Sequence, residues 1–251
     1  MIGDMGVFEG KFPQWAYLIG YNAISALLWI FVFGRTAAVA LSNGLSEVYL
    51  YPSVRIMVLL TQSLAALDIL HSIIGTFKHR SLPRNLADGS TGLVNAPVLT
   101  SFVQVAGRST VLWLVIENYQ SSALSPYYGL MILAWSAADA IRYLYFATKL
   151  IGGHQYSNLT WLRYSAFYVL YPVGIASEVG VVYETVSEAW RLGYYSHAWA
   201  YIAAALLYIP GKYCIFLDTK EAEFTDRSTA APTLFNHMIR QRRKVFASGK
   251  N

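Results

Sequence analysis

The hydrophobic pattern of this chain consists of long apolar stretches separated by shorter polar segments. Each stretch is apolar over roughly 20 residues, the length at which a helix spans about 30 Å of hydrocarbon. A transmembrane barrel strand would instead alternate polar and apolar residues over about ten positions. The pattern therefore predicts an all-α membrane protein, a bundle of about six transmembrane helices. The stretches cover residues 15–33, 54–77, 97–119, 127–148, 164–186 and 199–217.

The composition agrees with lipid as the solvent of these stretches. The chain is 55% hydrophobic and only 13% charged, whereas soluble domains have about 25% charged residues. The first ten residues contain Asp4 and Glu9 and no basic cluster, and a secretory signal peptide begins with a basic region. We therefore expect the first apolar stretch to be retained as a span.

The distribution of Lys and Arg predicts the topology. With the N-terminus in the cytosol, the opposite side holds only Arg35 and Arg191. This asymmetry follows the positive-inside rule and predicts an even number of spans with both termini cytosolic. The cytosolic segments then hold Lys11, Lys78, Arg80, Arg84, Lys149, Arg163, Lys220, Arg227, Arg240, Arg242, Arg243, Lys244 and Lys250.

These features predict three parts along the chain. Residues 1–14 form a cytosolic N-terminus, and residues 15–220 form the six-span domain, with a cytosolic loop near 78–96 that is rich in Pro and Gly. Residues 221–251 form a basic cytosolic tail. We favour a solvated tail that helps to determine topology, and contact with anionic lipid head groups is the alternative.

Ionisable residues inside the predicted spans are the first candidates for chemistry, because each costs about 2.5–3.5 kcal/mol at mid-bilayer. Asp139 and Arg142 are three residues apart in the fourth span, so they can pair on one helix face. Arg108 in the third span requires an acidic or carbonyl partner, and Asp68 or Glu117 can supply it. For both arginines, helix packing and substrate binding are open alternatives.

The fifth span contains the most specific constellation. Tyr171 and Glu178 are seven residues apart, about two helical turns, and therefore share one face. Tyr164 and Tyr168 continue this stripe toward the predicted cytosolic end. An aromatic stripe of this kind is often helix packing. A phenol and a carboxyl on one face are also a possible proton-transfer pair.

Two residues between the members of this pair can shape the helix locally. Pro172 removes a backbone donor and favours a kink. Gly174 allows another backbone or a ligand to approach closely.

The segment from Leu162 to Glu178 resembles the very-long-chain (3R)-3-hydroxyacyl-CoA dehydratases, also called the protein tyrosine phosphatase-like A family. In that family a Tyr-Pro-x-Gly core precedes a Glu that lies seven residues after the Tyr, as in Tyr171 to Glu178. The resemblance covers nearly the whole chain. Its other motifs are Ile69-Leu70-His71 with Gly75, Gln104-Val105 with Arg108, Trp135-Ser136 followed by Ile141-Arg142-Tyr143, and Tyr208-Ile209-Pro210-Gly211.

The resemblance implies an enzyme of the endoplasmic reticulum membrane that catalyses the third step of fatty-acid elongation. It would remove water from a long-chain (3R)-3-hydroxyacyl-CoA to give the trans-2-enoyl-CoA, without a metal or redox cofactor. The catalytic residues would be Tyr171 and Glu178. We favour Glu178 as the base toward C2 and Tyr171 as the proton donor to the leaving hydroxyl, and the reverse is the alternative.

The resemblance also suggests how the substrate is bound. Arg108 and Arg142 are candidates to hold the thioester oxygen, where negative charge develops. Tyr164, Tyr168 and Gly174 are further candidates for substrate contact. The acyl chain would lie among the spans, and the CoA phosphates would meet basic residues at the cytosolic edge. The expected partners are membrane lipids and the other elongation enzymes (a condensing enzyme and reductases), and no nucleic acid.

Two other functions compete with the dehydratase. A proton-coupled carrier would also place charges in its spans, but transporters tend to have matching broken helices in two inverted repeats. The break at Pro172 and Gly174 has no counterpart in the first three predicted spans. A non-catalytic scaffold for elongation enzymes would not require both Tyr171 and Glu178.

Overall fold

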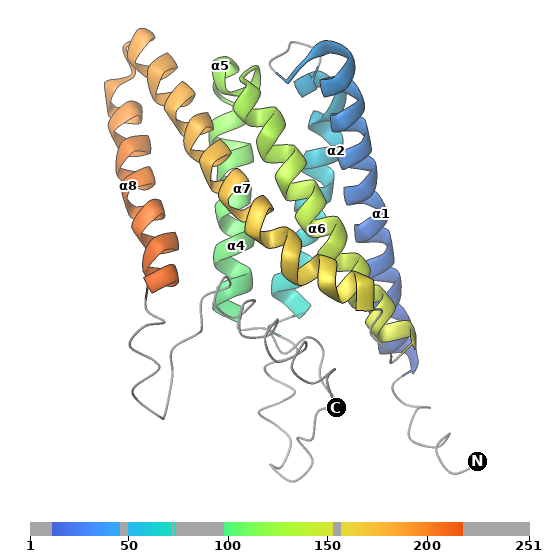
Figure 1. Cartoon of the computed structure of the whole chain (residues 1–251). Helices are drawn as coiled ribbons and strands as arrows, with labels where there is room; N and C mark the ends of the chain where they lie inside the picture. The colour runs from blue at the N-terminus through green and yellow to red at the C-terminus, as the bar shows by residue number, and fades with distance from the viewer. Residues whose placement is uncertain (1–11, 46–49, 72, 74–97, 153–156, 218–251) are drawn as a thin grey trace, which may run out of the picture. The chain divides into compact units, whose positions relative to one another are not determined.

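The computed structural model describes residues 12–45, 50–71, 73, 98–152 and 157–217, and the regular structure in these ranges is entirely helical (Figure 1). The predicted all-α class is therefore confirmed. Residues 1–11 of the predicted N-terminal segment, the whole loop near 78–96 and the tail 221–251 lie outside the described residues, and residues 12–14 belong to α1. The helices are α1 Phe12–Asn43, α2 Leu50–Ala65, α4 Val98–Thr110, the π-helix η3 Val111–Ile116, α5 Gln120–Ala123, α6 Pro126–Gly152, α7 Ser157–Arg191 and α8 Tyr195–Leu217.

Four of the described helices are long and apolar enough to cross a membrane, and a shorter apolar helix covers Gln104–Ile116. They agree in position with the first, second, fourth and fifth predicted spans. The third prediction corresponds to α4 with η3, and the sixth corresponds to α8. A total of six spans remains a prediction. The four segments are Ala16–Asn43, Leu50–His71, Pro126–Ile151 and Asn158–Arg191.

Helix α1 continues ten residues beyond the predicted end of the first span, to Asn43. Thr36 supports this extension because its hydroxyl is fully buried and donates to the Val32 carbonyl at 2.7 Å. Gly44 then ends the helix with a positive φ of 94°, which favours glycine, and its N–H donates to the Ala40 carbonyl. Arg35, which we predicted in the following connection, therefore lies inside α1.

The chain forms two compact units. Unit 1 contains α1, the start of α2 as far as Val54, α6, and α7 as far as Ser177. Unit 2 contains α2 from Arg55, α4, η3, α5, α7 from Glu178, and α8.

In unit 1, α1 and α6 pack against each other along their length. Tyr21 of α1 meets Tyr143 of α6 edge-on, with ring centroids 5.9 Å apart. Near the other end of α1, the backbone approaches Gly129 of α6 so closely that an added Cβ would lie 3.1 Å from the Leu45 carbonyl oxygen and 2.8 Å from Leu50 Cδ2. The two helices are thus antiparallel. Their most buried side chains include Trp29, Val32, Met131 and Ile132.

In unit 2, α2 runs antiparallel to α4 and η3. Arg55 at the start of α2 pairs with Glu117 just after η3. Further along, Gln62 donates to the Val105 carbonyl at 3.5 Å. The paired residue numbers rise on α2 while they fall on the partner, as antiparallel packing requires.

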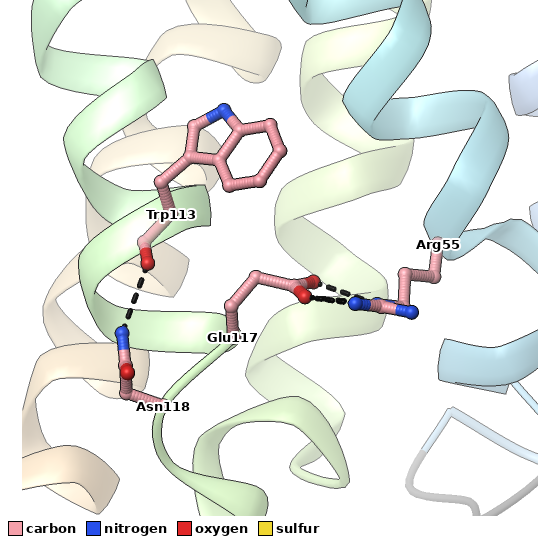
Figure 2. Close-up of polar contacts among 4 residues, drawn as sticks. All are labelled: Arg55, Trp113, Glu117 and Asn118. Atoms are coloured by element: carbon pink, nitrogen blue, oxygen red, sulfur yellow. Dashed lines mark hydrogen bonds and ion pairs between the residues drawn. The ribbon is translucent and has the colours of Figure 1, made fainter.

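Helix α4 continues into the π-helical turn η3, which the sequence analysis did not predict. The Glu117 N–H donates to the Leu112 carbonyl, five residues back, at 3.1 Å. The Asn118 side chain then donates to the carbonyls of Trp113 and Leu114, at 2.9 and 3.1 Å; Figure 2 shows the first of these bonds. These bonds satisfy carbonyls that the end of a helix leaves without partners.

The short helix α5 is attached to α7 by side-chain hydrogen bonds. Ser122 and Thr185, both fully buried, share a bond of 2.6 Å between their hydroxyls. Ser121 donates its N–H and its hydroxyl to Glu188 Oε2, at 2.8 and 2.6 Å. This connection therefore has a fixed place against the C-terminal half of α7.

Candidate functional site

Tyr171 and Glu178 lie on one continuous helix, α7, which passes through Pro172 without interruption. At 1.5 Å per residue, the seven-residue spacing separates them by about 10 Å along the axis, and they differ by only about 20° around it. Tyr171 is half-buried, and Glu178 is buried, with 4% of its surface exposed. The prediction that both residues lie on one helix is thus confirmed, while their shared face and their catalytic roles remain predictions.

Gly174 lies one turn after Tyr171 and is buried. A Cβ built there would have Ala134 Cβ of α6 as its nearest neighbour, at 4.0 Å. This is ordinary van der Waals contact, so protein packing does not require a glycine. We expected Gly174 to permit the close approach of either another backbone or a ligand. Within unit 1 no backbone lies that close to it. Close approach of a ligand is therefore the remaining reason for a glycine at this position.

The predicted pair of Asp139 and Arg142 is formed on α6. Arg142 Nε lies 3.2 Å from Asp139 Oδ1, and the carboxyl is buried, at 2% exposure. The guanidinium also lies over the ring of Tyr143, 4.4 Å from its centroid. Arg142 therefore has both a carboxylate and an aromatic face to hold its orientation.

The remaining predicted contact residues are less closely defined. Tyr168 on α7 is 39% exposed. Tyr164 lies on the same helix, but its side chain is outside the described part of the structure. Arg108 is half-buried in the last turn of α4 and belongs to unit 2, whereas Arg142 belongs to unit 1.

Glu117, one of the two partners predicted for Arg108, is bound by Arg55. Figure 2 shows the guanidinium of Arg55, on α2, facing the Glu117 carboxylate, with Nε 2.9 Å from each oxygen and Nη2 as a further contact. Arg55 was not predicted as a partner of Glu117 from the sequence. The available signal was its position at the start of the second predicted span, opposite the end of the third if these spans pack as antiparallel neighbours.

The chemistry available on α7 is that of a phenol, which is a weak acid, and of a carboxyl two helical turns further along. A phenol donates or accepts a proton through its single oxygen, and a carboxyl group does so through either of its two oxygens. Such a pair suits a reaction that removes one proton and donates another. On α6, Arg142 supplies a positive charge held by Asp139 and Tyr143.

Comparison with known proteins identifies the family. The family model for "Protein tyrosine phosphatase-like protein, PTPLA" matches residues 85–248, a range that includes Tyr171 and Glu178. The chain belongs to this family. No solved structure matches the chain.

Several named dehydratases resemble the chain over almost its whole length. The "Very-long-chain (3R)-3-hydroxyacyl-CoA dehydratase hpo-8" of Caenorhabditis elegans is 29% identical, over 93% of this chain and 95% of the relative. The "Probable very-long-chain (3R)-3-hydroxyacyl-CoA dehydratase" of Schizosaccharomyces pombe is 31% identical, over 91% of this chain and 92% of the relative. The human "Very-long-chain (3R)-3-hydroxyacyl-CoA dehydratase 2" is 28% identical, over 92% of this chain and 81% of the relative.

Proposed function

We propose that this chain is a very-long-chain (3R)-3-hydroxyacyl-CoA dehydratase, a hydro-lyase that forms the trans-2-enoyl-CoA in the third step of fatty-acid elongation. One observation carries the proposal. The motif from Tyr171 to Glu178 lies on a single unbroken apolar helix in a PTPLA family member whose relatives bear that name.

In the proposed reaction, Glu178 removes a proton from C2, and the electrons of that C–H bond form the C2=C3 double bond. The C3–O bond breaks, and Tyr171 protonates the departing hydroxyl, which leaves as water. Glu178 then holds one proton more and Tyr171 one fewer, so a proton returns from the carboxyl to the phenolate before the next turnover. No electron is gained or lost, and the proposal includes no metal or redox cofactor.

Arg142 is the favoured residue to stabilise the thioester oxygen, with Arg108 as the second candidate. A positive group at that oxygen favours loss of the C2 proton, because negative charge moves onto the oxygen in the transition state. The contact of Arg142 with Asp139 and Tyr143 holds its guanidinium in place before the substrate arrives. Tyr168 and Gly174 would lie along the substrate.

The test is conversion of a long-chain (3R)-3-hydroxyacyl-CoA to the enoyl product by the purified protein in detergent. Tyr171→Phe and Glu178→Gln should each reduce kcat by about 10²–10⁴-fold. Tyr183→Phe and Glu184→Gln make the same chemical changes on α7 and should stay near wild type. Full activity in both site variants would reject the site, and no activity in the wild type would reject the function.

We also propose a six-span topology with both termini cytosolic, residence in the endoplasmic reticulum membrane, and association with other elongation enzymes. The topology is testable because Cys214 is the single cysteine. In a Cys214→Ser background, single cysteines introduced at Ser121 and at Lys149 should react with an impermeant thiol reagent from opposite sides of sealed vesicles. Labelling of both from the same side would contradict the topology.

A further inference from the structure

Arg163 lies in the second turn of α7, and its guanidinium stacks on two aromatic rings of α6. Its Cζ atom is 4.5 Å from the centroid of Tyr145 and 4.8 Å from that of Phe146. The two rings are 5.6 Å apart and inclined by 72°, so they hold the guanidinium from two directions. All of these residues belong to unit 1.

This stacked geometry is compatible with binding a phosphate. Stacking uses the faces of the guanidinium, whereas its N–H donors lie in its plane and match two phosphate oxygens. An arginine held on aromatic rings also loses less rotational freedom when it binds a ligand. The side chain is therefore preorganised for an anion.

The surrounding sequence also favours an anion. Between Asp139 and Glu178 the chain contains no acidic residue, but it contains Arg142, Lys149 and Arg163. Lys149 lies in the last turn of α6 and Arg163 near the start of α7, so two of these basic residues are at the same end of unit 1. Positive charge attracts anionic ligands.

The position of Arg163 along α7 matches the dimensions of acyl-CoA. Eight residues separate it from Tyr171, about 12 Å along the axis, and both side chains lean toward the helix N-terminus. The pantetheine arm has thirteen bonds from the thioester sulfur to the first phosphorus, or about 15 Å when extended, at the rise per bond of an extended peptide. A thioester near Tyr171 would therefore place that phosphate near Arg163.

We propose that Arg163, held against Tyr145 and Phe146, binds a phosphate group of the CoA part of the substrate. This inference rests on the proposed dehydratase function and adds a second point of recognition to it. Arg163 is a substrate-binding residue remote from the reacting atoms. Arg142, with its carboxylate partner, remains the candidate for the thioester.

The test compares two substrates with the same 3-hydroxyacyl group, one as the CoA thioester and one as the N-acetylcysteamine thioester, which lacks the phosphates. Arg163→Met should lower kcat/KM for the CoA substrate by about 10–100-fold, the loss of one charged hydrogen-bonded contact, mainly through KM. It should leave the truncated substrate unchanged. The kcat/KM of Arg163→Lys for the CoA substrate should lie between the values of the wild type and Arg163→Met, because lysine keeps the charge but not the planar fork.

Arg35→Met is the matched control. It removes one arginine from an exposed position on α1, toward the end of unit 1 that is remote from Tyr145, and it should affect neither substrate. Binding of free CoA, measured by calorimetry, should weaken in Arg163→Met and not in Arg35→Met.

Equal losses on both substrates, or unchanged CoA binding in Arg163→Met, would overturn the phosphate site and leave a packing role for the stacked arginine. If Arg163→Lys also gave equal losses on both substrates or unchanged CoA binding, misfolding of the Met variant would be excluded as the cause of that result. A wild-type protein that binds CoA through Arg163 but dehydrates neither substrate would instead overturn the proposed function.

Discussion

Arg55 binds both carboxylate oxygens of Glu117, and this pair joins α2 to the residue that directly follows the π-helical turn η3 (Figure 2). Glu117 is the more enclosed partner, with 13% of its side chain exposed, against 44% for Arg55. A two-pronged contact of this kind has better geometry than most surface ion pairs. It should therefore contribute measurably to the stability of unit 2.

Arg55→Met and Glu117→Gln should each lower the stability, and a double-mutant cycle should give a coupling of about 1 kcal/mol, the upper end for exposed pairs. In thermal unfolding in detergent, a loss of that size should lower the apparent Tm by about 2–4 °C. The exchanged pair Arg55→Glu with Glu117→Arg should recover part of the loss. Additive effects of the two single changes would show that the pair contributes nothing.

Gly129→Ala should destabilise unit 1. The new methyl group would lie 3.1 Å from the Leu45 carbonyl oxygen and 2.8 Å from Leu50 Cδ2, and relief of such overpacking costs about 1–3 kcal/mol. Gly34→Ala, on α1, is the matched control because nothing lies within 4 Å of its added Cβ. Thermal unfolding should show a lower apparent Tm for the first variant and an equal or higher one for the second.

Gly174→Ala separates packing from ligand contact. The structure has room for the methyl group, since its nearest neighbour would be Ala134 Cβ at 4.0 Å, so the apparent Tm should not fall. If the substrate lies along α7 at this turn, dehydratase activity should decrease through KM while folding is unaffected. Unchanged KM for the acyl-CoA would remove Gly174 from the proposed site.

The division of labour between Tyr171 and Glu178 can be tested with a leaving group that needs no proton. A 3-fluoroacyl-CoA loses fluoride, whose conjugate acid is much stronger than water, so an acid catalyst gives little benefit. If Tyr171 is the acid, Tyr171→Phe should eliminate fluoride at close to the wild-type rate, and Glu178→Gln should not. The opposite pattern would assign the base to Tyr171.

Glu188→Leu should loosen the connection between η3 and α6. The Glu188 carboxylate accepts two hydrogen bonds from Ser121, and removing a charged acceptor of this kind costs about 1–3 kcal/mol. Glu188→Gln retains an acceptor oxygen and should lose less. Hydrogen exchange at the amide of Ser121 should speed up in the order wild type, Gln variant, Leu variant, and identical rates would contradict this role.

The local features of the candidate site could be predicted from the sequence because they depend on helical periodicity. Tyr171 and Glu178 lie seven residues apart on one apolar helix, and Asp139 and Arg142 lie three apart, so their relation follows once the helix is predicted. The long-range partner of Glu117 could not be obtained in this way. It depends on which helices are neighbours and on their register.

The helix ends were also predicted poorly, for a physical reason. Hydropathy marks where the chain is apolar, whereas a helix ends where its last carbonyls find other partners. Helix α1 continues past Arg35 until Gly44 ends it, and α7 begins seven residues before its predicted span and ends five after it. The turn η3 has an apolar sequence, Val111–Ile116, with nothing to distinguish it from an ordinary α-helix.

The π-helical turn has a consequence for insertions and deletions in this part of the chain. A π turn holds one residue more than the α-helical hydrogen-bond pattern needs, so deletion of one residue within Val111–Ile116 can leave an ordinary helix behind. Because the wider turn absorbs the extra residue, the same deletion should leave the residues on either side close to their present orientation. Glu117 would then still face Arg55 on α2. Homologues that are one residue shorter here should therefore keep this ion pair.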